Sequence, residues 1–299
     1  MRNLHYHLVD VFTDRRFGGN QLAVFTNGRG IPDDWMQNIA RELNISETTF
    51  VLPPEDPAHD YRVRIFTPGK EMPMAGHPTV GTAFVLAREG MIQGERAVFE
   101  ERVGPIPVSI SYENGLPVQT TMTQPLPEFG TMFDDRAALA EMLSLDPTGI
   151  DDRYPAQIVS TGVPLLFVPL RDLSTIKAVK LRQDVSERLL QGHGLGEVFV
   201  FTMETERAAS TVHSRMFAPV LGIPEDPATG AASGPLGSYL VKYGIVEADP
   251  TATIIGEQGF EMGRPSIIHI EIDTDGDRFT AVRVGGQTVY IGEGFIQMP

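Results

Sequence analysis

The strongest constraint on the fold is an internal repeat in a chain of 299 residues. Three stretches of the first half recur in the second half in the same order, at offsets near 150 residues. The pairs are Glu47-Thr48-Thr49-Phe50-Val51 with Glu197-Val198-Phe199-Val200, Arg64-Ile65-Phe66-Thr67-Pro68 with Arg215-Met216-Phe217-Ala218-Pro219, and Gly76-His77-Pro78 with Glu225-Asp226-Pro227. This pattern predicts two similar halves. The alternative is that Arg-x-Phe-x-Pro is a strand-ending pattern that recurs by chance.

The first half alternates between strand and helix patterns. Residues 4–12, 22–25, 47–52 and 61–66 have the composition and spacing of strands. Asp33 or Asp34 opens a helix whose apolar residues recur at helical spacing, and Asn44 ends it.

A second helix is expected from Pro78, at its first position, to Gly90. Its residues are apolar on all sides up to Arg88, which predicts a buried helix. We therefore expect an α/β (α+β) protein of two pseudo-symmetric domains, each a mostly antiparallel curved sheet around a central helix. The proline-rich stretch at 123–127 suits a boundary, which gives domains at residues 1–124 and 125–281.

Composition excludes several classes of function. The net charge of −15 and the lack of a basic cluster argue against nucleic acid and against anionic membranes. The absence of cysteine excludes thiol catalysis, disulfides and thiolate metal sites. Since no signal segment and no run of about 18 apolar residues occurs, we expect a soluble cytoplasmic protein.

A second buried helix is expected in the second half of the chain, after Asp226, and the starts of the two helices predict an anion site. Unpaired backbone N–H groups at the helix starts, after His77 and after Asp226, would face each other across a cleft if the halves are related by a twofold axis. Such a site holds a carboxylate without Lys or Arg. The small residues Gly76, Gly230 and Ala231 would let a ligand approach the backbone.

Each candidate side chain also has a structural interpretation. Asp226 suits a helix N-cap, His77 suits a buried structural histidine, and Glu47 suits a solvated strand end. If Glu47 instead points into the cleft, desolvation would raise its pKa and make it a general acid and base.

No other motif supports a competing chemistry. Dinucleotide, P-loop, zinc-protease and nucleophile-elbow patterns are absent. His5 and His7 share a strand face and could touch a metal, but no carboxylate cluster accompanies them in the sequence, so a structural role is favoured and no metal is expected.

Taken together, the motifs resemble the PhzF-like phenazine biosynthesis family, whose fold is similar to that of diaminopimelate epimerase. The matching stretches cover nearly the whole chain. They are Asp10-Val11-Phe12-Thr13 with Gly19-Asn20, Ala40-Arg41-Glu42-Leu43-Asn44, Ser46-Glu47-Thr48-Thr49-Phe50, Arg64-Ile65-Phe66-Thr67-Pro68, Gly76-His77-Pro78-Thr79, Asp226-Pro227-Ala228-Thr229-Gly230 and Gly256-Glu257-Gln258-Gly259.

The resemblance implies a cofactor-independent isomerase, usually a homodimer, acting on a small carboxylate, with the segment 282–299 returning to the first domain. The family's best understood activity is the isomerisation of trans-2,3-dihydro-3-hydroxyanthranilate. Its catalytic Glu matches Glu47, its supporting His and Asp match His77 and Asp226, and Asn20, Gly76, Gly230 and Ala231 would lie near the substrate.

Two features bear on the substrate. The family pattern commonly has Ser where this chain has Ala231, which removes a hydroxyl contact and leaves the substrate open. The missing cysteines exclude the two-thiol mechanism of diaminopimelate epimerase and proline racemase. Three hypotheses follow: an isomerase with Glu47 as single proton shuttle, a non-catalytic carboxylate-binding protein, and an epimerase with Glu47 and His77 as two bases.

Overall fold

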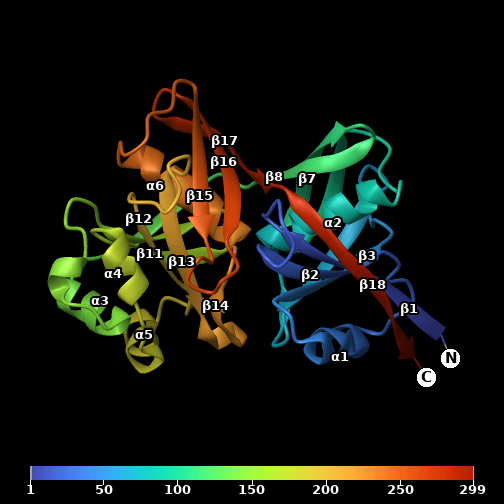
Figure 1. Cartoon of the computed structure of the whole chain (residues 1–299), viewed down its shortest axis with the longest axis horizontal. Coiled ribbons are helices and arrows are strands. Elements are labelled where there is room, and N and C mark those ends of the chain that lie inside the picture. The colour runs from blue at the N-terminus through green and yellow to red at the C-terminus, as the bar shows by residue number, and fades with distance from the viewer. Residues whose placement is uncertain (1, 299) are drawn as a thin grey trace. The chain divides into compact units, whose positions relative to one another are not determined.

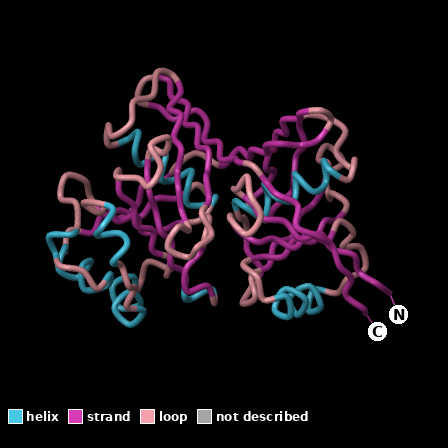
Figure 2. The backbone as a smooth tube through the Cα atoms, in the orientation of Figure 1, coloured by secondary structure: helices cyan, strands magenta, loops and turns pink. Residues whose placement is uncertain are grey.

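The chain forms two compact units in a computed structural model that describes residues 2–298 (Figures 1 and 2). Unit 1 comprises the described residues up to Gln124 and from Arg283 onward, and unit 2 comprises Pro125–Val282. Each unit is mainly strands, shown in magenta in Figure 2, with few helices. No helix among the described residues is long and apolar enough to cross a membrane.

The elements of unit 1 precede Gln124, except for one strand at the end of the chain. They are β1 Arg2–Val11, β2 Asn20–Phe25, α1 Asp33–Leu43, β3 Glu47–Leu52, β4 Tyr61–Phe66, β5 Glu71–Met72, α2 Gly76–Arg88, β6 Arg96–Glu101, β7 Gly104–Glu113, β8 Leu116–Gln124 and β18 Thr288–Met298.

Unit 2 carries more helices than unit 1. Its elements are β9 Glu128–Phe133, α3 Arg136–Leu143, the 3-10 helix η1 Pro147–Gly149, β10 Ala156–Ser160, β11 Pro164–Pro169, α4 Leu173–Ala178, α5 Gln183–Leu190, β12 Val198–Thr202, β13 Val212–Ala218, the 3-10 helix η2 Pro219–Leu221, β14 Ile223–Asp226, α6 Gly230–Lys242, β15 Thr251–Gln258 and β16 Ser266–Asp275. β17, Arg278–Gly286, starts in unit 2 and ends in unit 1.

The strand ladders of the two units match pair by pair. In unit 1, β2 pairs parallel with β3, β3 antiparallel with β4, β4 parallel with β6, and β6 antiparallel with β7. In unit 2, β11 pairs parallel with β12, β12 antiparallel with β13, β13 parallel with β15, and β15 antiparallel with β16. The predicted internal repeat is confirmed.

Register and ion pairs repeat as well. Phe50 of β3 faces Arg64 of β4, and Val200 of β12 faces Arg215 of β13. Both arginines form two-pronged ion pairs, with Glu71 at 2.8 and 2.9 Å and with Glu225 at 2.7 and 2.9 Å. The recurrence of Arg-x-Phe-x-Pro therefore marks equivalent strands, each tied by its arginine to the short strand that follows.

A buried helix lies at the centre of each unit (Figure 1). Every residue of α2 from Gly76 to Ala87 is buried, and the helix packs against β1, β2, β3, β7 and β8. The close approach needs Gly81, because a Cβ there would lie 2.6 Å from the Val11 side chain. In unit 2, α6 packs against β10, β15 and β16, and Gly237 serves the same purpose, since a Cβ there would lie 2.6 Å from Ile270.

The first helix follows the predicted pattern closely. The first turn of α1 has acidic residues, which interact favourably with the positive end of the helix dipole. The helix ends at Asn44, which has the left-handed backbone conformation that a short polar side chain tolerates. Its apolar face completes a core cluster with residues of β1, β2, β3 and β4: Leu4, Phe25, Ile31, Met36, Ile39, Ala40, Phe50 and Phe66.

Unit 2 contains three further helices, α3, α4 and α5, which the sequence analysis did not predict. Asp135 and Asp172 cap α3 and α4 by accepting hydrogen bonds from backbone N–H groups of the first turn. Arg215 fixes the end of α4, since its guanidinium donates to the carbonyl oxygens of Ile176 at 2.9 Å and Val179 at 3.1 Å.

Candidate active site

Glu47 is the first residue of β3 and is almost fully buried. In the parallel ladder it lies beside Leu22 of β2, and its side chain is 11% exposed. The strand is covered on both faces, because all its residues from Glu47 to Val51 are buried, and the Thr49 hydroxyl contacts that of Thr82 in α2 at 2.8 Å. The interpretation of Glu47 as a solvated strand end is therefore wrong.

His77 is the second residue of α2. The helix begins at Gly76, two residues before the predicted start at Pro78. Proline is tolerated there because the N–H groups of the first helical turn have no acceptor within the helix. The imidazole is 4% exposed, and burial lowers the pKa of His77 to about 3, partly opposed by a hydrogen bond with the backbone of Gln21. The ring is therefore neutral at neutral pH.

The Asn20, His77 and Glu47 side chains form a continuous chain of polar contacts. His77 Nε2 lies 3.1 Å from Glu47 Oε2, and Asn20 Nδ2 lies 3.1 Å from His77 Nδ1. Because the Asn20 amide nitrogen donates to Nδ1, the neutral imidazole carries its proton on Nε2, which faces Glu47 Oε2 both when the carboxyl group is ionised and when it holds a proton on Oε1. The arrangement can thus stabilise Glu47 with or without its proton.

Asn20 reaches this position through a tight turn. Gly19 has φ +61°, and a Cβ at this residue would lie 2.2 Å from the carbonyl oxygen of Val11, so only glycine fits. β2 then starts at Asn20, which pairs with Val11 of β1. The Gly19-Asn20 motif of the sequence is therefore a turn that delivers one side chain to His77.

Glu101, the last residue of β6, is a buried acid that sequence analysis missed. The Thr79 hydroxyl donates to the carbonyl oxygen of Ala75 at 2.6 Å and also contacts Glu101 Oε1. Since a threonine has one hydroxyl proton, Thr79 donates to only one of these two oxygens at a time. Burial raises the pKa of Glu101 to about 8, so the carboxyl group is mainly protonated at neutral pH. The only signal was its alternation with Ala97 and Phe99 on the buried face of β6.

In unit 2, Asp226 ends β14 and is buried with 6% exposure. The helix α6 begins four residues later at Gly230, and its N-cap residue is Thr229. The Thr229 hydroxyl donates to Asp226 Oδ2 at 2.5 Å. The predicted helix start directly after Asp226, and the N-cap role for this residue, are wrong.

The loop between Asp226 and α6 is held by the Gly-Glu-Gln-Gly motif at the end of β15. Gln258 Nε2 donates to the Asp226 carbonyl at 2.7 Å and to the Thr229 hydroxyl at 2.9 Å, while Oε1 accepts from the Thr229 N–H at 3.1 Å. Gly259 has φ +77°, and a Cβ there would lie 2.5 Å from the Pro227 carbonyl oxygen. The motif thus fixes the Asp226 loop.

The ladder gives Glu101 and Gln258 equivalent positions. Beside β4, Arg62 pairs with Glu100, and beside β13, His213 pairs with Glu257, so the next residues along are Glu101 and Gln258. Both side chains bond the N-cap region of the central helix. At this position a protonated carboxyl group in unit 1 therefore makes the contact with the helix start that a neutral amide makes in unit 2.

The same comparison corrects the predicted pairing of His77 with Asp226. The helices α2 and α6 are each 13 residues long, and the Thr79 and Ser233 hydroxyls bond the carbonyl oxygens of their N-cap residues in the same way. In this alignment the residue equivalent to His77 is Ala231, the second residue of α6. The prediction failed because it matched Pro78, inside the first helical turn, with Pro227, in the loop before the helix.

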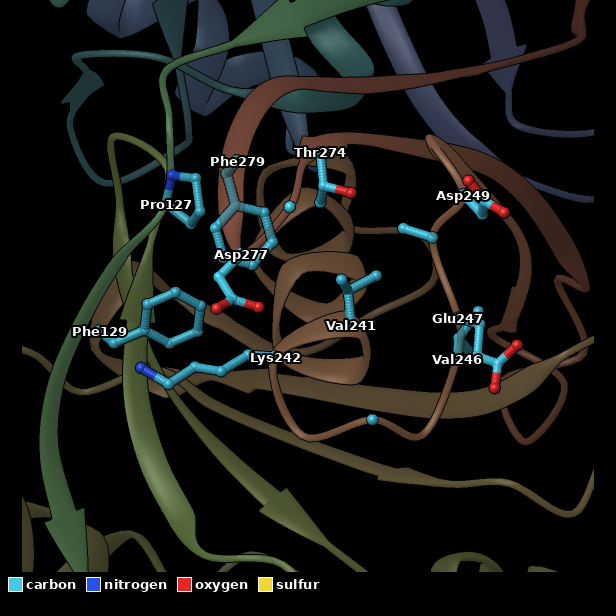
Figure 3. A pocket seen from close by; sticks show the side chains of 13 residues that line it. Pro127, Phe129, Val241, Lys242, Val246, Glu247, Asp249, Thr274, Asp277 and Phe279 are labelled. Atoms are coloured by element: carbon cyan, nitrogen blue, oxygen red, sulfur yellow. The ribbon is translucent and has the colours of Figure 1, made fainter.

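A surface pocket of about 680 Å³ in unit 2 contains none of the predicted site residues (Figure 3). It lies at Val241 and Lys242, the opposite end of α6 from Gly230. Its charged groups are the Lys242 ammonium, which lies 3.7 Å from the centre of the Phe129 ring, and three acids, Glu247, Asp249 and Asp277. This charge balance does not suit a carboxylate ligand.

Comparison with known proteins agrees with these motifs. The sequence profile described as phenazine biosynthesis-like protein matches residues 9–294. The chain belongs to the PhzF family. The predicted family and its α/β fold are thereby confirmed, because the match spans both units.

Several relatives of this PhzF family member are named isomerases. The chain is 35% identical over 292 residues to trans-2,3-dihydro-3-hydroxyanthranilate isomerase of Pseudomonas chlororaphis, covering 98% of this chain and 99% of the relative. It is 34% identical over 294 residues to an uncharacterized isomerase of Clostridium acetobutylicum, covering 97% of each. A PhzF-family phenazine biosynthesis protein of Bacillus anthracis has the same fold, with a TM-score of 0.91, 29% identity and complete coverage of both chains. These similarities support an isomerase.

Proposed function

We propose that the chain is a cofactor-independent isomerase of a small cyclic amino or hydroxy carboxylic acid, with Glu47 as its proton shuttle. The similarity to trans-2,3-dihydro-3-hydroxyanthranilate isomerase supports this choice of substrate class. The observation that carries the proposal is the buried contact between His77 Nε2 and Glu47 Oε2 at 3.1 Å. A buried carboxyl group beside a neutral imidazole is a suitable general acid and base.

In the proposed reaction, the Glu47 carboxylate removes a proton from a ring carbon. The electron pair of the broken C–H bond enters the ring as a double bond shifts, and Glu47 becomes a carboxylic acid. Glu47 then returns the proton to a second carbon of the same ring, where a new C–H bond forms. Atoms and electrons balance without a further reactant, and the imidazole of His77 keeps its proton on Nε2 throughout.

The start of α2 supports an anionic substrate. The N-cap residue Ala75 provides no side-chain cap, so the first N–H groups of the helix keep hydrogen-bonding capacity and a partial positive charge. Glu101 stays neutral at pH 7, since its pKa is raised to about 8. The helix start therefore carries no negative side chain from Glu101 that would repel a carboxylate.

Asp226 is proposed to orient an amino or hydroxyl group of the substrate. Its carboxylate is buried, and the hydrogen bond from Thr229 fixes its rotamer. The role of this residue is separate from proton transfer. An Asp226→Asn variant should therefore weaken substrate binding more than it slows exchange in bound substrate.

Deuterium incorporation tests the proton shuttle. Incubation of the enzyme in D₂O with trans-2,3-dihydro-3-hydroxyanthranilate and related cyclic amino acids, followed by NMR, should show isomerisation with solvent deuterium at the new C–H position. Glu47→Gln should reduce exchange by about 10² to 10⁴-fold, the usual contribution of a general acid and base. Glu197→Gln is the matched control, since Glu197 is the buried repeat counterpart of Glu47 in unit 2.

Full exchange in Glu47→Gln would contradict the proposal. Binding without exchange in the native enzyme would favour a non-catalytic carboxylate-binding protein instead. An epimerase with Glu47 and His77 as two bases would racemise a chiral substrate. The 3.1 Å contact argues against it, because it joins the two side chains into one proton-accepting unit rather than two separate bases.

A further inference from the structure

A second group of polar side chains lies on β1 and β18. His5 and His7 project from the same face of β1, two residues apart, and Glu293 of β18 lies directly opposite His7 in the antiparallel ladder. His5 Nε2 is 3.1 Å from Glu293 Oε2. One ligand atom from each of the three residues lies within 4.8 Å of the others. Glu293 follows His5 by 288 residues along the chain, so the sequence shows no carboxylate cluster near these histidines.

A β-bulge adds a fourth polar atom to the cluster. Leu8 faces Gly292 but Val9 faces Tyr290, so Ile291 is an extra residue in β18 and the register shifts by one. Tyr290 is thereby turned to the face that carries Glu293. Its hydroxyl group lies 3.2 Å from His7 Nδ1 and donates to Glu293 Oε2 at 3.2 Å.

The cluster is separate from the candidate active site. His7 pairs with Val24 of β2, and Asn20, which contacts His77, pairs with Val11. The four-residue separation along the strands corresponds to about 13 Å at 3.3 Å per residue. The cluster therefore needs a role of its own.

We propose that His5, His7 and Glu293 bind a divalent transition-metal ion, with Zn²⁺ as the expected class. Two imidazoles and one carboxylate match the donor preference of Zn²⁺, Co²⁺ and Ni²⁺ and not that of Mg²⁺ or Ca²⁺, which favour oxygen ligands. Bonds of about 2.0 to 2.2 Å in a tetrahedral site place ligand atoms about 3.3 to 3.6 Å apart, close to the 3.1 Å between His5 Nε2 and Glu293 Oε2.

The bound ion would join the first and last described strands of unit 1. β1 and β18 pair along almost their whole length, from Arg2 with Met298 to Val11 with Thr288. A ligand that binds only the folded state raises stability in proportion to the logarithm of its concentration over Kd. The role proposed for the ion is therefore to stabilise this strand pair.

The test uses the untagged full-length protein, freed of metal by chelator and dialysis. Titration calorimetry with Zn²⁺ and visible absorption with Co²⁺ should show one ion per chain, and Zn²⁺ should raise the Tm. His5→Gln and Glu293→Gln should each weaken binding at least tenfold and abolish most of the Tm shift. Their metal-free Tm and circular dichroism establish that both variants fold.

A single histidine–carboxylate pair elsewhere in unit 1 provides the control. His59 Nδ1 lies 2.9 Å from Glu100 Oε1, without a second histidine, and His59→Gln should leave Zn²⁺ binding unchanged. The proposal is overturned if no ion binds, if Mg²⁺ binds as tightly as Zn²⁺, or if the His5 and Glu293 variants keep the native Kd.

Discussion

Units 1 and 2 share a strand ladder but differ at the start of the central helix. In unit 1, buried Glu47 contacts His77, which contacts Asn20. In unit 2, the position equivalent to Glu47 is occupied by the buried Glu197, but the position equivalent to His77 is occupied by Ala231. Leu166 of β11 and Ala23 of β2 are equivalent in the two ladders. The position of Asn20, three residues before Ala23, therefore corresponds to Val163. Unit 2 therefore has the buried carboxyl group but has neither the imidazole nor the amide at the equivalent positions.

This difference separates the duplicated fold from the chemistry. The ion pairs Arg64–Glu71 and Arg215–Glu225 occur in both units, so they belong to the architecture. The neutral imidazole that serves both protonation states of a carboxyl group occurs in unit 1 alone among these equivalent positions. A single proton shuttle follows naturally from this asymmetry, whereas a mechanism with two equivalent bases would need the pair in both units.

The largest expected difference between the units concerns their equivalent arginines. Arg215→Ala should destabilise the protein by about 3 to 5 kcal/mol, because it leaves Glu225 and two carbonyl groups at the end of α4 without their partner. Arg64→Ala should cost about 1 to 2 kcal/mol, since Arg64 bonds only side chains, one of them exposed. Urea unfolding of both variants checks this order, and equal losses would contradict it.

His77→Ala should lower kcat about 10²-fold, equivalent to about 2.7 kcal/mol, with a much smaller change in KM. The loss follows because Glu47 would lack the group that supports both of its protonation states. Ala231→His places the same side chain at the equivalent position of unit 2 and should leave kcat unchanged. Steady-state kinetics together with the Tm separates this role from a packing defect, which would lower the Tm without selectively lowering kcat.

A pH-dependent difference between the units concerns Glu101 and its counterpart Gln258. The folded state keeps the Glu101 proton up to a pKa of about 8, whereas an ordinary glutamic acid loses it near 4.5. Stability should therefore fall by about 1.4 kcal/mol per pH unit as pH rises between these values. Glu101→Gln should remove this slope and stabilise the protein at pH 9.

Gln258→Glu should introduce a similar slope in unit 2. Urea unfolding between pH 5 and 9 measures both variants against the native protein, so that slopes from other titrating groups cancel. Parallel curves for the native protein and Glu101→Gln would show that Glu101 is ionised in the folded state.

Much of the fold could be predicted from sequence, because it depends on local patterns. The boundaries of β3 and β4 and the end of α1 at Asn44 match the structure. The start of α2 was placed two residues late, since Pro78 is as compatible with the third helical position as with the first. The two-unit repeat was visible because its equivalent strands carry the same Arg-x-Phe-x-Pro pattern.

The parts of the site that could not be predicted depend on contacts distant in sequence. Glu101 lies between the charged residues Glu100 and Arg102 in the sequence, and its contact with Thr79 at the start of α2 depends on the tertiary structure. Glu293 meets His5 and His7 through the pairing of the two end strands. The alignment of His77 with Asp226 failed because a proline pattern does not reveal where a helix begins.

The pairing of β1 with β18 also has a consequence for the order in which the protein folds during synthesis. Unit 2 is complete once residue 282 has left the ribosome, whereas unit 1 lacks a strand until residues 288–298 have been made. Domains generally fold as units. The unit that carries Glu47 and His77 therefore completes its sheet only after β18 has been made, which is later than the completion of unit 2.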